Sequence, residues 1–239
     1  EVFASLSSKE LATNLWHGSK LKIFAEYNQK IAKQHDNLIV LGFDFRKSVH
    51  LFRNMTWATR LAASTNFGVS RLVYFMGGVD NWIAPKFNST IWVDQTKNYQ
   101  YQTLATSMRG FSQNTRNGTS FALLSTELRM PVVQLVTGKK ISRPFFNSIQ
   151  LIAFADLGTA WTGLTPYSEE NCLYTRYIDS GNIHAVVKRQ VDPWIIGVGA
   201  GLRASLLGYF LRFDYAWGIE NFQVADKKGM FLFSIGTDF

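Results

Sequence analysis

Hydrophobic and polar residues alternate along much of the chain, the pattern of β-strands that present one apolar face. The final segment is the clearest: Phe231, Phe233 and Ile235 share one face, whereas Leu232 and Ser234 lie on the other. Nine segments alternate in this way: 21–28, 39–46, 57–63, 71–76, 122–130, 149–157, 196–205, 211–218 and 230–239. Since no segment carries a convincing 3.6-residue apolar stripe, the sequence predicts an antiparallel all-β fold.

The charges on these segments indicate which face is inside. A soluble sandwich buries the apolar stripe, whereas a membrane barrel turns it towards lipid. None of the nine apolar stripes carries a charge, as expected in lipid, where a midplane Lys or Arg costs about 2–4 kcal/mol. The opposite faces carry acids and bases at mid-strand: Glu26, Asp44, Arg46, Arg60, Glu127, Arg129, Asp156, Arg203, Arg212 and Asp214. This distribution favours a transmembrane β-barrel with a polar lumen.

Linker lengths give a second test, because outer-membrane barrels have short periplasmic turns and long outer loops. If the chain ends in the periplasm, the two longest linkers, 79–119 and 159–193, both lie outside. The same parity places 47–54 and 219–229 outside, and 30–36, 65–70, 133–148 and 206–210 inside. The fit is imperfect, because 47–54 is short for an outer loop and 133–148 is long for a turn.

Composition excludes several other classes of protein. The chain has 239 residues, of which 15% are aromatic, so it is not intrinsically disordered. The single cysteine, Cys172, excludes a disulfide framework. We expect no signal peptide and no transmembrane helix. The net charge of +8 comes from scattered residues and close pairs. This pattern favours attraction to anionic lipid over nucleic-acid binding.

No catalytic or metal-binding pattern emerges from the reactive side chains. The histidines are not spaced as metal pairs and do not sit beside a Ser and an Asp: His17, His35, His50 and His184. We therefore expect no catalytic site, metal or cofactor. The 79–119 linker is unusually aromatic, with Trp82, Trp92, Tyr99 and Tyr101. These side chains could anchor the linker on a partner or at the membrane interface, or pack it upon itself.

One short motif lies late in that linker, Met108-Arg109-Gly110-Phe111. It resembles the arginine-glycine-aromatic motif in the sixth outer loop of the BamA/TamA-like superfamily, the bacterial surface antigen family. The strands that follow in that family resemble further segments here, in the same order: 126–131, 154–158, 197–203, 211–216 and 234–239. The resemblance covers about residues 70–239, whereas 1–69 resemble barrel strands in general.

The resemblance implies roles for particular residues. Arg109 would enter the lumen and bond Asp156, with Glu127 nearby, so that Arg109, Gly110, Phe111, Glu127 and Asp156 form a structural latch that supports barrel integrity and transport. Judged without the family, the residues favour the simpler interpretation that Arg109 is a solvated loop residue, with Asp156 paired to Arg129 or Arg203. The aromatic final strand resembles a membrane-insertion signal, carried by Phe231, Phe233, Ile235 and Phe239.

The family also implies a function and partners. A bacterial outer-membrane barrel of this kind inserts or translocates other proteins without enzymatic activity. Its partners would be outer-membrane lipid and lipopolysaccharide, client or partner outer-membrane proteins, and the remaining amino-terminal part of a barrel of about sixteen strands. Because single-chain bacterial barrels have an even strand number, either a strand is missed within 1–17 or residues 1–239 form one carboxy-terminal barrel portion. A barrel anchor for a separate soluble or enzymatic domain, or a small diffusion pore, remains the alternative.

Overall fold

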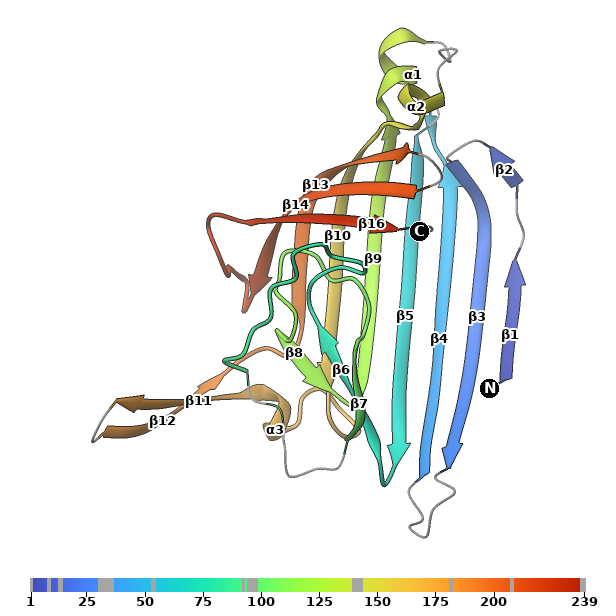
Figure 1. Cartoon of the computed structure of the whole chain (residues 1–239). Coiled ribbons are helices and arrows are strands. Elements are labelled where there is room, and N and C mark those ends of the chain that lie inside the picture. The colour runs from blue at the N-terminus through green and yellow to red at the C-terminus, as the bar shows by residue number, and fades with distance from the viewer. Residues whose placement is uncertain are drawn as a thin grey trace.

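Antiparallel strands make up most of the computed structural model (Figure 1). The structure describes residues 2–7, 10–12, 15–29, 37–52, 55–91, 93, 99–138, 144–180, 183–206 and 209–236. The main sheet, called the wall below, contains β1 (Val2–Ser7), β2 (Glu10–Ala12), β3 (Leu15–Gln29), β4 (Asn37–His50), β5 (Thr56–Gly68), β9 (Ser120–Pro131), β10 (Gln150–Trp161), β13 (Ile195–Leu206), β14 (Tyr209–Glu220), β15 (Gln223–Val224) and β16 (Met230–Gly236).

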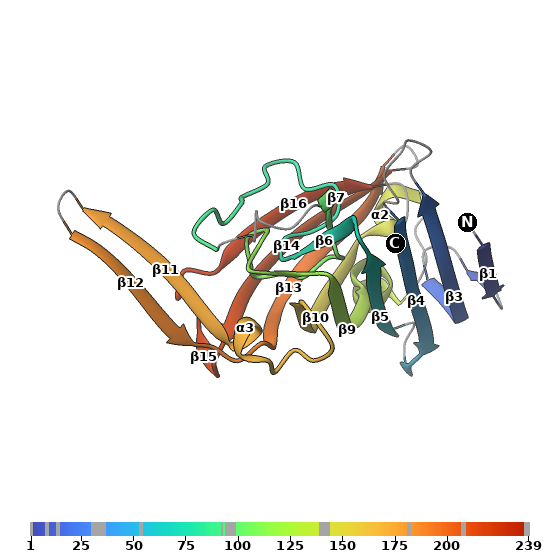
Figure 2. The ribbon, with the colours of Figure 1, turned by 90° about the horizontal axis from the view of Figure 1, so that it is seen from below.

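Neighbouring strands of the wall follow one another along the chain. The order is β1, β3, β4, β5, β9, β10, β13, β14 and β15, with β2 also paired to β3 and β16 to β14. The wall curves, and the linker between β5 and β9 lies on its concave side (Figure 2). Within the described residues, β1 and β16 do not pair with each other, so the wall stays open.

The predicted antiparallel all-β architecture is confirmed, and eight of the nine predicted segments are strands of the wall. The segment 71–76 is an exception. It forms β6 (Arg71–Met76), which pairs with β7 (Tyr99–Leu104) and β8 (Arg116–Gly118) in a separate three-stranded sheet. Consequently β5 pairs directly with β9. The physical reason is that β6 is apolar on both faces, with Leu72 and Val73 both buried, so it needs cover on two sides.

Because β6 is not a strand of the wall, the linkers that precede it lie at the other end of the wall from the end that was predicted. The expectation that 47–54 lies at the end of the long linkers is wrong, as is the placement of 65–70 at the opposite end. Residues 30–36 lie outside the described residues, but the strand ends that flank them, Gln29 and Asn37, lie beside Gly68. The β4–β5 connection instead lies with the 133–148 and 206–210 connections (Figure 1). This arrangement removes the anomaly of a short outer loop at 47–54.

The amino-terminal residues and the linkers contain elements that alternation did not reveal. Both β1 and β2 pair with β3, so a strand was missed within 1–17. Three short helices also occur among the described residues: α1 (Val132–Thr137), α2 (Pro144–Ser148) and α3 (Glu169–Cys172). Each is too short to show an apolar stripe. In the described part of the chain, no helix has the length and hydropathy to cross a membrane. The 159–193 linker also contains a hairpin of β11 (Leu173–Ser180) and β12 (Ile183–Gln190).

The two faces of the wall have opposite character, as predicted. Large apolar side chains on the convex face are 36–60% exposed: Ile23, Leu41, Phe43, Trp57, Leu61, Leu124, Leu151, Leu202, Phe213, Tyr215, Phe231 and Ile235. Charged side chains on the concave face are buried, among them Glu127, Asp156, Arg203 and Asp214. Apolar groups outside and charges inside are the arrangement of a strand wall in lipid.

This orientation predicts a depth-dependent response to a new charge on β5. Leu61→Arg places a cation at mid-strand on the convex face and should cost about 2–4 kcal/mol of unfolding free energy in lipid vesicles. Phe67→Arg, on the same face at the end of β5, should cost about 0–1 kcal/mol. Urea titration of the vesicle-bound protein measures both, and equal losses would contradict the assignment of faces.

Candidate functional site

The linker between β5 and β9, called the inner loop below (residues 69–119), packs into the concave side of the wall by an apolar cluster. The cluster joins residues of the loop to residues of β4, β5 and β9. Its buried members are Leu38, Val40, Ala62, Leu72, Tyr74, Met76, Met108, Phe111, Phe121 and Leu123, with Ala160 and Ile195. Met76, Met108 and Leu123 are at most 1% exposed. Burial of these side chains brings the Arg109 backbone to the wall.

Arg109 forms a bidentate ion pair with Asp156 of β10. Arg109 Nε donates to Asp156 Oδ2 at 2.7 Å, and Nη2 donates to Oδ1 at 2.6 Å. The Arg109 backbone N–H also donates to Oδ2 at 3.3 Å, and Ser125 Oγ donates to Oδ1 at 2.6 Å. Planar guanidinium and carboxylate groups that bond in this way fix each other's orientation as well as their distance.

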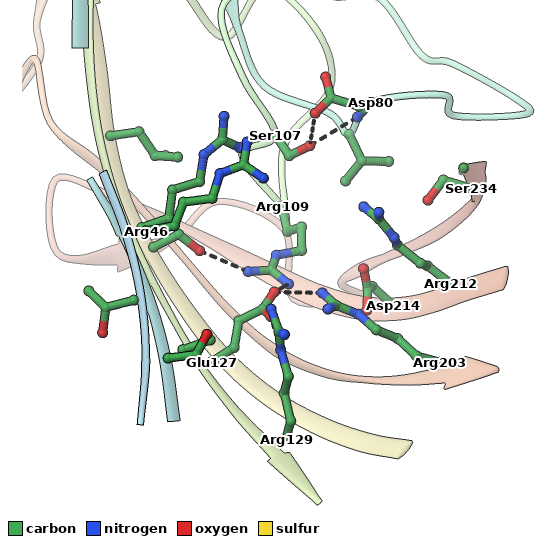
Figure 3. A pocket seen from close by; sticks show the side chains of 18 of the residues that line it. Arg46, Asp80, Ser107, Arg109, Glu127, Arg129, Arg203, Arg212, Asp214 and Ser234 are labelled. Carbon is green, nitrogen blue, oxygen red and sulfur yellow. Dashed lines mark hydrogen bonds and ion pairs between the residues drawn. The ribbon is translucent and has the colours of Figure 1, made fainter. Parts of the chain in front are cut away.

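Glu127 of β9 receives three guanidinium groups. Arg109 Nη1 and Arg203 Nη2 each donate to Glu127 Oε1 at 2.7 Å. Arg129 donates to Oε2 through Nε at 3.0 Å and Nη2 at 2.9 Å. Figure 3 shows these arginines converging on Glu127 from the loop, β9 and β13. The carboxylate therefore ties the loop to two strands of the wall.

Burial makes this cluster costly to break. Arg109, Glu127 and Asp156 are 5%, 3% and 1% exposed. The Arg109 guanidinium also lies over the Phe154 ring, 3.6 Å from its centroid. Desolvation opposes the charge on Arg109, but Asp156 and Glu127 outweigh it and raise the pKa of the guanidinium above its ordinary value. Arg109 thus stays charged where an unpaired cation would be strongly unfavourable.

Glycines allow the motif backbone to approach the wall closely. Gly110 has a φ of 87°, and a Cβ there would lie 2.7 Å from the Trp217 carbonyl carbon. On the wall, a Cβ at Gly197 would lie 2.0 Å from the Arg109 carbonyl oxygen, and one at Gly218 would lie 2.6 Å from the Phe111 ring. The loop therefore rests on backbone that carries no side chain.

A second ion pair, between Arg116 and Glu220, fixes the loop at the end of the wall where β14 ends. Arg116 Nη2 donates to Glu220 Oε1 at 2.5 Å and to the Asp192 carbonyl oxygen at 2.9 Å. Arg116 is the first residue of β8, the last strand of the inner loop before β9, and Glu220 is the last residue of β14. The ion pairs of Arg109 and Arg116 thus tie the loop to β9, β10 and β14.

A cavity of about 270 Å³ remains between the loop and the wall. Its charged lining is mainly basic: Lys20, Arg46, Arg60, Arg109, Arg129, Arg203 and Arg212, against Asp80, Glu127 and Asp214. Asp44 pairs with both Arg46 and Arg60, at 2.9 and 2.8 Å. Across the residues that the structure describes, no three His, Cys, Asp or Glu side chains are placed to hold a metal ion.

Comparison with known protein families identifies the family to which this chain belongs. The family model of the Omp85 superfamily domain matches residues 16–239. The chain belongs to the Omp85 superfamily. Omp85 proteins are β-barrels of the bacterial outer membrane, in agreement with the apolar convex face. A comparison with curated proteins finds no match.

In this Omp85 domain, Arg109, Glu127 and Asp156 come together, whereas Arg129 and Arg203 bond Glu127 rather than Asp156. Sequence reasoning placed both arginines on the lumen face but did not assign them to the cluster. A signal was present in the sequence. The motif leaves two lumen-facing acids, Glu127 and Asp156, to share the single base Arg109, and the further lumen-facing bases Arg129 and Arg203 could balance the charge. That the cluster serves as a latch in function stays a prediction.

The side chains of the final strand, β16, face the sides of the wall that the alternation predicted. Phe231 and Ile235 are exposed on the convex face, at 60% and 37%. Phe233 shares that face and stacks on Phe213 with ring centroids 4.5 Å apart. Phe239 lies outside the described residues. The role of these residues as an insertion signal also stays a prediction.

Arg109→Ala should free the inner loop without preventing membrane insertion. The substitution leaves Asp156 and Glu127 buried without their shared cation, at a cost of about 3–5 kcal/mol. Protease digestion of the vesicle-bound protein should cut the inner loop faster than in the wild-type protein, while the strands of the wall stay protected by the membrane. Arg109→Lys, which keeps the charge and loses the bidentate geometry, should fall between. Unchanged loop cleavage in Arg109→Ala would contradict a structural role for the cluster.

Gly110→Ala should loosen the loop through a steric clash. Gly163, with a φ of 90° and nothing within 4 Å of its Cβ position, is a matched control for backbone strain. Both alanines incur about 1–2 kcal/mol of left-handed strain, but only Gly110→Ala also meets the Trp217 backbone. Loop cleavage should rise for Gly110→Ala alone, and equal rates for the two variants would show that close approach is unimportant.

Proposed function

We propose that this Omp85 domain inserts or translocates other proteins at the outer membrane. Family membership supports an outer-membrane role of this general kind. The observation that carries the proposal is the edge of β16: one side pairs with β14 over seven residue pairs, whereas the other side has no strand partner among the described residues. In lipid, an edge strand must find backbone partners.

The backbone of β16 indicates which groups an incoming strand would meet. Ile83 N donates to the Phe233 carbonyl oxygen at 3.0 Å, so the polar backbone groups of Phe233 point away from β14. Because direction alternates along a strand, those of Phe231 and Ile235 point the same way. A client strand added there would place its apolar side chains beside an exposed aromatic face.

Insertion by this domain would need no covalent bond to form or break. A client strand would exchange for the barrel's own closing strand, and backbone hydrogen bonds would template its insertion. We place the carboxy terminus on the periplasmic side, so clients arriving from the periplasm would meet β16 first. Lipid and lipopolysaccharide would contact the convex face.

Insertion of a client barrel tests this function. Vesicles that contain the protein should convert a urea-unfolded outer-membrane barrel to its protease-resistant form several-fold faster than empty vesicles. Phe231→Pro removes an edge N–H donor and should slow this conversion, whereas Phe231→Ala keeps the donor and should not.

Other outcomes would favour the other functions. No acceleration, together with steady ion conductance in a planar bilayer, would favour a diffusion pore. No acceleration and no conductance would favour an anchor for a separate domain.

A further inference from the structure

Three basic side chains lie directly opposite one another on the concave face of the wall, on β3, β4 and β5. Lys20 is in register with Arg46, and Arg46 is in register with Arg60. All three residues, called the basic row below, line the cavity between the inner loop and the wall. Like charges placed directly opposite each other on neighbouring strands lower the stability of a sheet. The basic row is therefore unfavourable unless negative charge compensates it.

One carboxylate, that of Asp44, bonds two members of the basic row. Asp44 Oδ2 accepts from Arg46 Nη2 at 2.9 Å and from Arg60 Nη2 at 2.8 Å. Lys20 has no ion-pair partner among the residues that the structure describes. The row and Asp44 together carry three positive charges and one negative charge, a net charge of +2.

The acids that line the same cavity are engaged elsewhere. Glu127 accepts from three guanidinium groups, and Asp80 accepts from Ser107 Oγ at 2.8 Å. Asp214 lies on β14, and three strands of the wall separate β14 from β5. These carboxylates therefore leave the positive charge at the basic row in place.

The opposite side of the cavity is basic as well. Arg203 on β13 and Arg212 on β14 are in register with each other, so like charges again lie opposite on neighbouring strands. Figure 3 shows the Arg46 and Arg212 side chains entering the cavity from opposite sides. Bases on both sides raise the positive potential in the space between them.

The size of the cavity and the chemistry of its bases indicate which anion fits. The volume is about 270 Å³, whereas one water occupies roughly 30 Å³, so a small anion fits together with its water. The Arg46 and Arg60 side chains are 31% and 24% exposed, and salt screens partly buried charges less than surface charges. Guanidinium forks match the oxygens of a phosphate, and a lysine binds it as a point charge. A phosphate group carries a charge of about −1.5 to −2 at pH 7, which balances the net charge of the row.

We propose that the basic row binds a phosphate group inside the lumen cavity, either as inorganic phosphate or as a phosphomonoester. The bound anion would lie among Lys20, Arg46 and Arg60 and would remove the repulsion between β3, β4 and β5. A ligand that binds only the folded state stabilises that state, so phosphate should stabilise the wall. This inference is independent of client insertion, because it concerns a site on the lumen face rather than an edge strand.

Thermal unfolding of the full-length membrane protein in phosphate-free detergent tests the site. Sodium phosphate should raise the wild-type midpoint by more than sodium chloride does at the same ionic strength. Lys20→Gln relieves repulsion, so its midpoint without phosphate should equal or exceed that of the wild type, while its shift with phosphate should be several-fold smaller. Lys86→Gln, which removes an exposed lysine of the inner loop outside the cavity, is the matched control and should keep the full shift.

Equilibrium dialysis with radioactive inorganic phosphate measures binding directly. Lys20→Gln and Arg60→Gln should each weaken binding several-fold relative to the wild type and Lys86→Gln. Arg60→Lys keeps the charge but loses the fork, and should fall between. Competition with glycerol 3-phosphate distinguishes the two sources: displacement at similar concentrations assigns the site to phosphomonoesters as well, and failure to displace restricts it to the free ion.

Three outcomes would overturn the proposal. Absence of phosphate binding by the wild-type protein, with a lowered midpoint of Lys20→Gln, would show that an acidic group of the protein itself compensates the row. Equal midpoint shifts with phosphate and chloride would reduce the effect to ionic screening. Equal phosphate binding by Lys20→Gln and Lys86→Gln would place the bound phosphate elsewhere. The client-insertion assay is separate, so its failure would remove the proposed function and leave the phosphate site standing.

Discussion

A buried guanidinium fixes the position of the inner loop. Arg109 lies at 5% exposure within a wall whose outer face is apolar, where a cation without partners would be far less stable than in water. Asp156, Glu127 and the Phe154 ring together compensate its desolvation. These partners come from β9 and β10, so the requirement to pair one charge fixes the loop against two adjacent strands.

The glycines and the apolar cluster follow from that requirement. For Arg109 to reach Asp156 with its backbone N–H as well as its side chain, the motif must lie directly on β13 and β14. Gly197 and Gly218 provide the space, because any side chain there would overlap the motif. Met108 and Phe111, on either side of Arg109 and Gly110, are then buried with β9 residues such as Leu123. The ion cluster sets direction and register, and the apolar contacts supply most of the buried area.

Sequence periodicity predicted the wall because a strand in lipid needs an uncharged face, and that constraint acts on every residue of the stripe. It did not predict the place of β6, because alternation is the same for a wall strand and for a strand inside the loop. The distinguishing signal was that Val73 and Phe75 made the second face of β6 apolar as well. Periodicity also could not assign Arg203 to Glu127, since they are 76 positions apart and a hairpin and two strand connections lie between them. Pairing among many lumen charges depends on three-dimensional register, and only the family resemblance singled out Arg109 with Asp156.

The inner loop makes contacts of two different strengths with the wall. The Arg109 cluster is buried and shared among several hydrogen bonds, so removing Arg109 leaves the buried Asp156 without its guanidinium partner. The contact of Ile83 with β16 is a single backbone hydrogen bond at a half-exposed residue. Loss of that bond would leave the ion pairs of Arg109 with Asp156 and Glu127 in place. The Arg109 cluster, rather than the contact with β16, therefore determines where the loop lies in the lumen.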